Sequence, residues 1–488
     1  MRTLRAVAAC GATVIGLAAC GGAGRTADGP REIPRTTTST EALAEFERGL
    51  EKLDRLRAAD AREHFERAVA ADPEFAWAHL MLATTAPTTT AAWEALHAAQ
   101  EKAAAASQGE QLLIAAATAG VNGEQEQQVR LLERLVDAYP DSPRAQVALG
   151  NVLFGLQEWC GAIDAYRTAV ELDPDFSPPY NQLGYCLRFT GDLEGAEAAF
   201  RKYVALIPDE PNPYDSLAEL LWKRGRFEES IATYRKALEH DPRFVPSYVG
   251  IGNNQIMLGR GDEARETFRT LEREIARGPA ERRLARTWAA VSRLHEGDHD
   301  AALREIDARR AIAEETDDRT AIANDLAARG EILLDAGRVD DADAAFAASV
   351  EMMDASDAPP EVKENYRRSA QFDTGRIALA RGDLERAAQI AESYRAQAKA
   401  SGVRQVIWEA HELVGLVELA MDDPSGALYE LELSDPQDPR VMYLKARAYL
   451  AIGMEAEGRE LALRAADFNG LSFTWPLIRD EARALARS

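Results

Sequence analysis

Four prolines recur at a constant interval of 34 residues, at positions Pro140, Pro174, Pro208 and Pro242. An interval of this length accommodates one pair of helices, and a single pair cannot bury its apolar face. Because proline cannot continue a helix, each proline is expected to end the second helix of its pair. The interval therefore predicts an all-α fold in which successive helix pairs stack on one another.

The amino-acid composition agrees with a helical chain. Of the 488 residues, 7% are aromatic and 28% are charged, and segments that alternate Val, Ile or Thr with polar residues are scarce. The formal net charge is −24. Such an excess of acidic groups repels phosphate backbones, so we expect no nucleic-acid partner, and it favours basic protein partners.

The residues between the prolines follow one pattern, in which large residues flank a glycine on the first helix and an alanine and an aromatic follow on the second. In the unit that starts at Ser177 these residues are Tyr180, Leu183, Gly184, Leu187, Ala196 and Phe200. The pattern resembles the tetratricopeptide repeat. The resemblance implies an α-solenoid of helix-turn-helix repeats that winds into a right-handed superhelix. In such a repeat the small residues let the two helices approach, and Phe200 fills the space between them.

The pattern covers most of the chain. The units that start at Pro143, Pro211 and Val245 keep the register of the unit at Ser177, and weaker copies precede them. After Ala276 the closing prolines are lost and the glycines of the inter-helix turn recur at 40 or 45 residues, which predicts longer helices. We expect N-terminal repeats over 41–107, a regular array over 108–276, divergent repeats over 277–470 and a C-terminal capping helix over 471–488.

The N-terminus is typical of an export signal. Arg2 and Arg5 precede an apolar run that is too short to span a bilayer. The run ends in Leu17-Ala18-Ala19-Cys20, which resembles the lipobox of bacterial lipoproteins. The resemblance implies that residues 1–19 are a lipoprotein signal peptide and that Cys20 is lipidated after cleavage. An ordinary cleaved signal is the alternative.

Two further expectations concern the membrane. Gly21 stands where lipoproteins kept at the inner membrane usually have Asp, which implies an outer-membrane location that faces the periplasm. Residues 20–40 are rich in Gly, Pro and Thr and have no apolar periodicity, so we expect a flexible tether there. Acyl chains on Cys20 would hold the protein at the membrane without a transmembrane helix.

In tetratricopeptide arrays the first helix of each pair lines the concave face. Carried onto this sequence, the groove positions are Arg144, Asn151, Asn181, Tyr185, Arg188, Asp215, Glu219, Trp222, Lys223 and Asn253. Asparagine amides both donate to and accept from a main chain, and aromatic rings supply apolar contact, so these residues suit an extended peptide. Polar residues that face only solvent are the alternative. Glu331, Glu409 and Glu412 are expected to extend the groove with acidic character, which predicts a basic partner.

These features predict a non-enzymatic, membrane-anchored lipoprotein that acts as a protein- or peptide-binding scaffold in a bacterial envelope complex and needs no cofactor. One alternative is a metal-dependent hydrolase, because His295-Glu296-Gly297-Asp298-His299 matches the zinc-protease signature H-E-x-x-H. That chemistry needs both histidines on one continuous helix, whereas Gly297 and Asp298 are expected at an inter-helix turn. A solute-binding lipoprotein is another alternative, but it would require two α/β lobes, which no part of the pattern suggests.

Cys160 and Cys186 fall on a second helix and on the first helix that follows it, which pack together in such arrays. Export would permit a disulfide between them. Because pairing cannot be deduced from sequence, the preferred interpretation is two buried thiols that act as small apolar residues.

Overall fold

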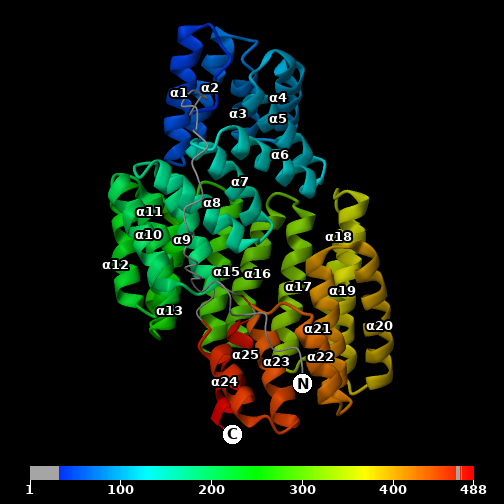
Figure 1. Cartoon of the computed structure of the whole chain (residues 1–488). Coiled ribbons are helices and arrows are strands. Elements are labelled where there is room, and N and C mark those ends of the chain that lie inside the picture. Colours follow the sequence, from blue (N-terminus) through cyan, green and yellow to red (C-terminus); the bar gives the residue numbers. More distant parts are fainter. Residues whose placement is uncertain (1–31, 469–472, 474, 488) are drawn as a thin grey trace, which may run out of the picture. The chain divides into compact units, whose positions relative to one another are not determined.

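The computed structural model describes residues 32–468, 473 and 475–487, and every regular element within these residues is a helix (Figure 1). This confirms the all-α fold that the proline interval predicts, and it leaves no α/β lobe in the described residues for a solute-binding protein. The chain divides into two compact units, residues 1–220 and 221–488. Each unit consists of helix pairs.

In the first unit, the two helices of each pair contact each other, and the second helix of a pair also contacts the first helix of the next pair. The helices are α1 (Thr40–Asp54), α2 (Ala58–Ala71), α3 (Ala76–Thr84), α4 (Thr89–Lys102), α5 (Gln108–Val121), α6 (Gln125–Ala138), α7 (Pro143–Gly155), α8 (Trp159–Leu172), α9 (Pro178–Thr190) and α10 (Leu193–Leu206), with a short 3₁₀ turn at Ala103–Ala105. Helix α11 (Pro211–Lys223) begins in this unit and ends in the other.

The second unit continues the same alternation from α13 to α24. Its helices are α12 (Phe227–His240), α13 (Val245–Met257), α14 (Gly261–Thr270), a π-helical turn (Leu271–Ile275), α15 (Pro279–His295), α16 (His299–Glu314), α17 (Arg319–Asp335), α18 (Val339–Asp354), α19 (Pro360–Ala380), α20 (Leu384–Ser401), α21 (Arg404–Ala420), α22 (Pro424–Glu432), α23 (Pro439–Ala451), α24 (Glu455–Ala466) and α25 (Trp475–Arg487).

The four evenly spaced prolines follow the ends of second helices, as predicted. Helices α6, α8, α10 and α12 each end two residues before one of them. Helices α7 to α13 have 13 or 14 residues, whereas α15 to α21 have 16 to 21. The longer helices expected after Ala276 are therefore confirmed over this stretch.

A glycine on the first helix and an aromatic ring 16 residues later pack the two helices of a pair. A β-carbon built on Gly184 would lie 2.6 Å from Cε1 of Phe200, and Phe200 is completely buried. The same close approach recurs in four other pairs, between Gly49 and Phe65, Gly150 and Tyr166, Gly252 and Phe268, and Gly330 and Phe346. The absent side chain at each glycine is what lets the ring enter, which confirms the role expected for these residues.

The turn between the two helices of a pair requires a left-handed backbone. Gly191, which ends α9, has φ of +88°, and Gly337, between α17 and α18, has φ of +73°. Glycine adopts such angles without steric cost, so the recurring turn glycines of the sequence have a backbone explanation. Leu56, Gln157 and Asp422 take positive φ in place of glycine at other turns.

Residues 32–39 differ from the flexible tether expected over 20–40. Ile33 is 1% exposed in the apolar core of the first unit, and Thr36 N donates to Glu110 Oε1 at 2.9 Å. Ser107 Oγ donates to Pro34 O at 2.9 Å. The expectation is wrong for these eight residues, because one buried isoleucine and main-chain hydrogen bonds fix a segment whose composition is otherwise that of a linker. Residues 20–31 lie outside the described residues.

The C-terminal helix α25 does more than cover the last helix pair. Trp475 Nε1 donates to Ala465 O of α24 at 2.9 Å, which is the contact expected of a capping helix. The same helix contacts α23 and α15, where Arg479 Nη2 donates to the main-chain oxygen of His295 at 3.1 Å. It thereby joins the last pair of the second unit to a pair far earlier in the sequence.

Candidate functional site

A cavity of about 340 Å³ lies within the first unit, and we call it the N-terminal groove. Most of its wall comes from the first helices of five successive pairs. The lining residues are Ile33, Leu50, Leu53, Asp54, Leu56, Trp77, Met81, Thr84, Leu113, Arg144, Val147, Ala148, Asn151, Phe176, Pro178, Asn181, Gln182 and Tyr203. The wall is largely apolar, with a few polar groups, which is the usual composition of a site that binds organic ligands or peptide side chains.

Three of the residues that the sequence assigned to the groove, Arg144, Asn151 and Asn181, lie together in this cavity. Arg144 forms a two-point ion pair with Asp54 at the end of α1, with Nη1–Oδ1 and Nη2–Oδ2 distances of 3.0 and 2.6 Å. Its guanidinium also stacks over Phe176, 4.9 Å from the ring centroid. Arg144 is therefore already held in place at the groove wall.

The two asparagines differ in their hydrogen bonds. Asn151, at the wall of the cavity, accepts through Oδ1 from the hydroxyl of Tyr166 at 2.8 Å. Asn181 Oδ1 is buried and has no hydrogen-bond partner among the described residues. An unsatisfied buried carbonyl is costly, so a main-chain N–H of a bound peptide would find a ready acceptor here.

Tyr185, Arg188 and Glu219 do not line the cavity. The Tyr185 hydroxyl donates to Glu219 Oε2 at 3.1 Å, and Arg188 forms an ion pair with the same carboxylate. Burial, followed by the Glu219 charge, raises the pKa of Tyr185. These three side chains connect α9 to α11 and satisfy one another, so the structure gives them a role in holding successive first helices together.

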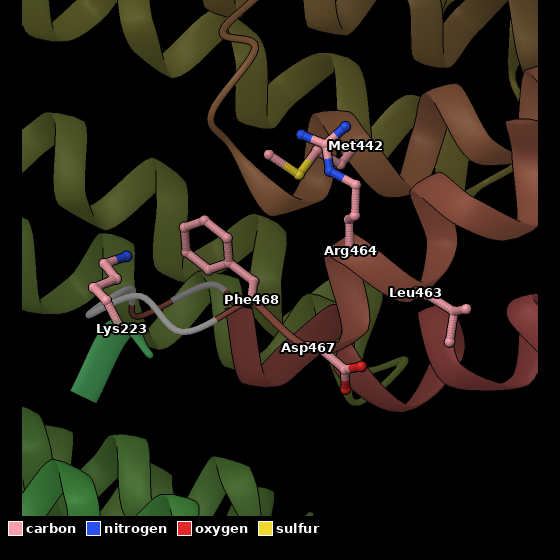
Figure 2. Close-up of a pocket in the computed structure, with 6 residues that line it drawn as sticks. All are labelled: Lys223, Met442, Leu463, Arg464, Asp467 and Phe468. Carbon is pink, nitrogen blue, oxygen red and sulfur yellow. The ribbon is translucent and has the colours of Figure 1, made fainter. Parts of the chain in front are cut away.

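The other residues assigned to the groove lie on α11 and α13. Asp215 is half-buried on α11. Trp222 is 4% and Asn253 5% exposed, and Trp222 Nε1 and Asn253 Nδ2 have no hydrogen-bond partner among the described residues. Lys223 faces the Phe468 ring at 4.9 Å, at the edge of a shallow, open depression of the second unit (Figure 2). The N-terminal groove contains none of these four.

A second cavity, of about 270 Å³, lies in the second unit, and we call it the C-terminal groove. Its wall again comes mainly from successive first helices, here α17, α19, α21 and α23. The lining residues are Asn324, Ala327, Glu331, Ser349, Tyr366, Ser369, Ala370, Phe372, Asp373, Glu409 and Arg440. Glu331 and Glu409 were expected on this face. Glu412 was too, but it is 3% exposed and paired with Arg440, so it lies behind the wall.

Two neighbouring carboxyls of the C-terminal groove, Glu331 and Asp373, differ in pKa. Arg376 Nη1 lies 2.5 Å from Glu331 Oε1 and 3.5 Å from Asp373 Oδ1, and Arg440 is engaged by Glu412. Burial, followed by the neighbouring Glu331 carboxylate, raises the pKa of Asp373 to about 8. Burial alone would raise the pKa of Glu331, but Arg376 and Arg440 hold it below its ordinary value. At neutral pH one carboxyl of the groove therefore keeps its proton.

The two histidines of the H-E-x-x-H match lie on different helices. His295 is the last residue of α15, Gly297 has φ of +76°, and His299 is the first residue of α16. His295 faces Arg479, whereas His299 Nε2 lies 2.7 Å from Asp335 Oδ2. Among the described residues, no three His, Cys, Asp or Glu side chains come together in a way that could hold a metal ion. The geometry therefore does not support the hydrolase alternative.

The structure describes two of the three cysteines that the sequence analysis singled out. Cys20 lies outside the described residues. Cys160 is exposed and Cys186 is buried, and neither forms a disulfide. The interpretation as two buried thiols is thus wrong for Cys160, because its position near the start of α8 faces outward.

No helix in the described part of the chain is long and apolar enough to cross a membrane.

Several lining residues escaped the sequence analysis. Trp77 and Met81 come from α3, where the glycine of the repeat is missing and the register could not be carried over, and Asp54 is the last residue of α1, which lies outside the regular array. Trp77 and Met81 stand four residues apart, a spacing that places both on one helix face and was the available signal. Asp373 stands two residues before the Gly375 of its helix, but its long helix α19 obscures the register.

Comparisons with known proteins identify the repeat in part of the chain. Residues 129–175 and 216–279 match one family model of the tetratricopeptide repeat, and residues 165–198 match another. Among proteins with curated descriptions, none is similar in sequence to this chain.

Similar solved structures include three proteins with tetratricopeptide repeats. One comes from Parabacteroides merdae, with 16% identity, coverage of 57% of this chain and 98% of that chain, and a TM-score of 0.37. A thermophilic one comes from Thermus thermophilus, with 21% identity, coverage of 38% and 98%, and a TM-score of 0.30. YrrB, described as having an unusual peptide-binding site, has 18% identity, coverage of 37% and 91%, and a TM-score of 0.29.

Proposed function

We propose that this chain, which belongs to the tetratricopeptide repeat family through residues 129–198 and 216–279, binds an extended segment of a partner protein in the N-terminal groove. Proteins of this family are protein-interaction scaffolds, and the concave surface formed by their first helices is the extended surface such arrays offer. The chain then acts as a scaffold and not as a catalyst.

One observation carries the proposal: five successive first helices share a single cavity that combines apolar walls with unsatisfied amide chemistry. Leu53, Trp77 and Met81 supply apolar surface for a side chain. Asn181 Oδ1 supplies an acceptor without a partner among the described residues. This combination suits a peptide, whose main chain needs hydrogen bonds and whose side chains need apolar contact.

The test is to fill the groove without changing its charge. Ala148 lines the cavity, and Ala148→Trp would occupy much of its volume. The matched control is Ala205→Trp, at an exposed position of α10. Twelve-residue peptides selected from a random display library on the wild-type chain should lose at least about tenfold in affinity to Ala148→Trp, measured by fluorescence anisotropy, and bind the control as before. Peptides that bind both variants equally would contradict the proposal.

The proposal extends to the charge of the partner. The net charge of −24 and the acidic side chains of the C-terminal groove favour a basic segment. Selected peptides should therefore be enriched in Lys and Arg, and their affinity should fall between about 50 mM and about 500 mM NaCl, because exposed charge pairs are screened. Affinity that does not change with salt would count against a basic partner.

The location of the scaffold is also proposed: lipidated Cys20 anchors it in a bacterial envelope complex, at the outer membrane and facing the periplasm. Support comes from the Leu17-Ala18-Ala19-Cys20 sequence and the apolar run before it. Metabolic labelling with an alkyne-bearing palmitate should mark the wild type but not Cys20→Ser. Cys10→Ser, the same change at the other cysteine of the N-terminal apolar run, is the control and should be labelled like the wild type. Label retained in Cys20→Ser would reject the anchor and leave the peptide-binding proposal untouched.

A further inference from the structure

We propose that the C-terminal groove is a binding site for a primary ammonium group, such as the side chain of a lysine in the partner. The inference deepens the proposed function, because it assigns the chemistry of a second groove. It rests on that function only for the source of the ammonium group.

The first support is the cavity itself. It is bounded mainly by first helices of four successive pairs, and its volume of about 270 Å³ exceeds what the four methylenes and ammonium head of a lysine occupy. Its polar lining is mixed: Asn324, Ser369 and Tyr366 offer oxygen acceptors in addition to the carboxylates. An ammonium group has three donors and no acceptor, so a wall of oxygen atoms is the surroundings it requires.

The second support is an acceptor that lacks a fixed donor. Glu331 Oε1 is taken by Arg376, but Glu331 Oε2 is buried, and no N–H group of the described residues donates to it. The neighbouring Asp373 carboxyl can reach Glu331 with its own acid proton. Without a ligand, the carboxyls of Asp373 and Glu331 share this proton in a hydrogen bond.

The third support is the balance of charge around Asp373. The groups that face it are Glu331 from α17, Tyr366 and Arg376 from its own helix α19, Tyr394 from α20, Glu409 from α21 and Arg440 from α23, while α18 contributes the neutral Ser349 to the cavity. Counting Glu412, which pairs with Arg440 behind the wall, four carboxyls stand against two guanidinium groups. Of these carboxyls, Glu409 accepts from the neutral hydroxyl of Tyr394 at 2.9 Å and from an amide of Gln405, and both donors are uncharged. The proton on Asp373 reduces the excess of negative charge from two to one, and an ammonium group bound in its place would do the same.

The exchange can be written as a balanced step. The ligand enters as R–NH₃⁺, Asp373 releases its proton to solvent, and the new carboxylate pairs with the ammonium group. Because the pKa of Asp373 is about 8 and that of a lysine ammonium is about 10.4, the ligand stays charged over the range in which Asp373 ionises. Binding should therefore strengthen as pH rises from 6 toward 8, by up to about tenfold per pH unit, and level off above 8.

The probe is Nα-acetyl-lysine methylamide, and its matched control is the norleucine counterpart, which has the same carbon chain without the ammonium group. Titration calorimetry on the full chain should show binding of the lysine probe only, with release of close to one proton at pH 7 when buffers of different ionisation enthalpy are compared. Cadaverine, tested in parallel, distinguishes a free diamine from a peptide as the source: the probe that binds more tightly identifies the natural ligand.

Asp373→Asn preserves the shape of the protonated side chain and should keep the fold. We expect it to weaken binding of the lysine probe at pH 8.5 by at least about tenfold and to abolish the pH dependence. Asp357→Asn, the same change at an exposed position, should alter neither. Equal binding of the lysine and norleucine probes, or a wild-type pH profile in Asp373→Asn, would overturn the inference. The effect of Ala148→Trp on peptides in the N-terminal groove is independent of this result.

Discussion

The ring of Phe200 lies against the main chain of Gly184, so closely that a β-carbon on Gly184 would fall 2.6 Å from the ring. The two residues stand on α9 and α10, 16 positions apart, and the ring enters the space that a side chain at position 184 would occupy. Real β-carbons do not tolerate such a distance. The stability of the pair therefore depends on the absence of a side chain at position 184.

Gly184→Ala is expected to destabilise the protein by about 1–3 kcal/mol, because the added methyl must displace a fully buried ring. Urea denaturation of the variant measures the loss. Phe200→Leu makes room for the methyl, so the double variant should lose less than the sum of the two single variants. Additive losses would show that the contact is not the cause.

Gly337→Ala tests the turn rather than the packing. No atom lies within 4 Å of a β-carbon at this position, so the only cost is the left-handed backbone, which we expect to be about 1 kcal/mol. Gly155→Ala is the matched control: its β-carbon also meets nothing within 4 Å, but the residue is helical at the end of α7. The control should leave stability unchanged or raise it slightly. A similar loss in both variants would contradict the backbone explanation.

Asp54→Asn tests the ion pair at the wall of the N-terminal groove. The substitution leaves the partly buried Arg144 without its two-point partner and should cost about 1 kcal/mol. Because the pair joins the end of α1 to α7, amide hydrogen exchange in α1 should become about fivefold faster. Asp60→Asn, which removes an exposed pair with Arg57, should have little effect. Unchanged hydrogen exchange in Asp54→Asn would show that the ion pair does not stabilise the contact between α1 and α7.

His295 should make the protein less stable in mild acid. Burial, followed by the charge of Arg479, lowers the pKa of His295 from 6.5 to about 4. Between these values the unfolded chain binds a proton that the folded chain excludes, so the contribution of His295 is fully favourable above pH 6.5 and is lost as pH falls toward 4. The shift corresponds to at most on the order of 3 kcal/mol, and less because the imidazole retains some solvent contact.

The measurement is the difference in unfolding free energy between pH 7 and pH 4.5 for the wild type and for His295→Gln. The variant should lose less stability on acidification than the wild type. His97→Gln, at an exposed histidine of α4, should behave as the wild type does. An identical pH profile for His295→Gln and the wild type would show that this histidine is protonated normally in the folded protein.

Removal of metal should leave the protein unchanged. His295 and His299 lie on separate helices with separate partners, so we expect purified protein to contain no stoichiometric zinc and its Tm to be unaffected by chelation. Metal analysis and a thermal melt with and without EDTA check this. One zinc per chain together with a lowered Tm after chelation would revive the hydrolase alternative.

The repeat itself could be predicted from the sequence because its determinants are local. The 16-residue relation of Gly184 to Phe200 and the turn glycine Gly337 are each set within one helix pair. The side-chain contacts of the N-terminal groove could not be predicted in this way, because they join residues of different helix pairs. Asp54 and Arg144 are 90 residues apart, and only the stacking of the intervening pairs brings their side chains together. The resemblance to the tetratricopeptide repeat implies which face is concave, but not which side chains on that face neutralise one another.

Tyr185 and Arg188 illustrate the same limit. Their register correctly placed them on a first helix. However, Tyr185 donates a hydrogen bond to Glu219 on α11, and Arg188 forms an ion pair with the same carboxylate. Asp373 is the converse case: its helix was recognised, while its importance depends on Glu331 from another pair. Side chains whose role depends on contacts between pairs cannot be read from a pattern that repeats within a pair.

The contact of α25 with α15 changes how the second unit should come apart. In an open array each pair touches only its neighbours, so the ends fray and melting proceeds from pair to pair. Here the last helix holds on to a pair near the beginning of the unit through Arg479 and His295, so that loss of the C-terminal end exposes the interior of α15 as well. The pairs between them are thereby tied into a single cooperative block, which would melt as one.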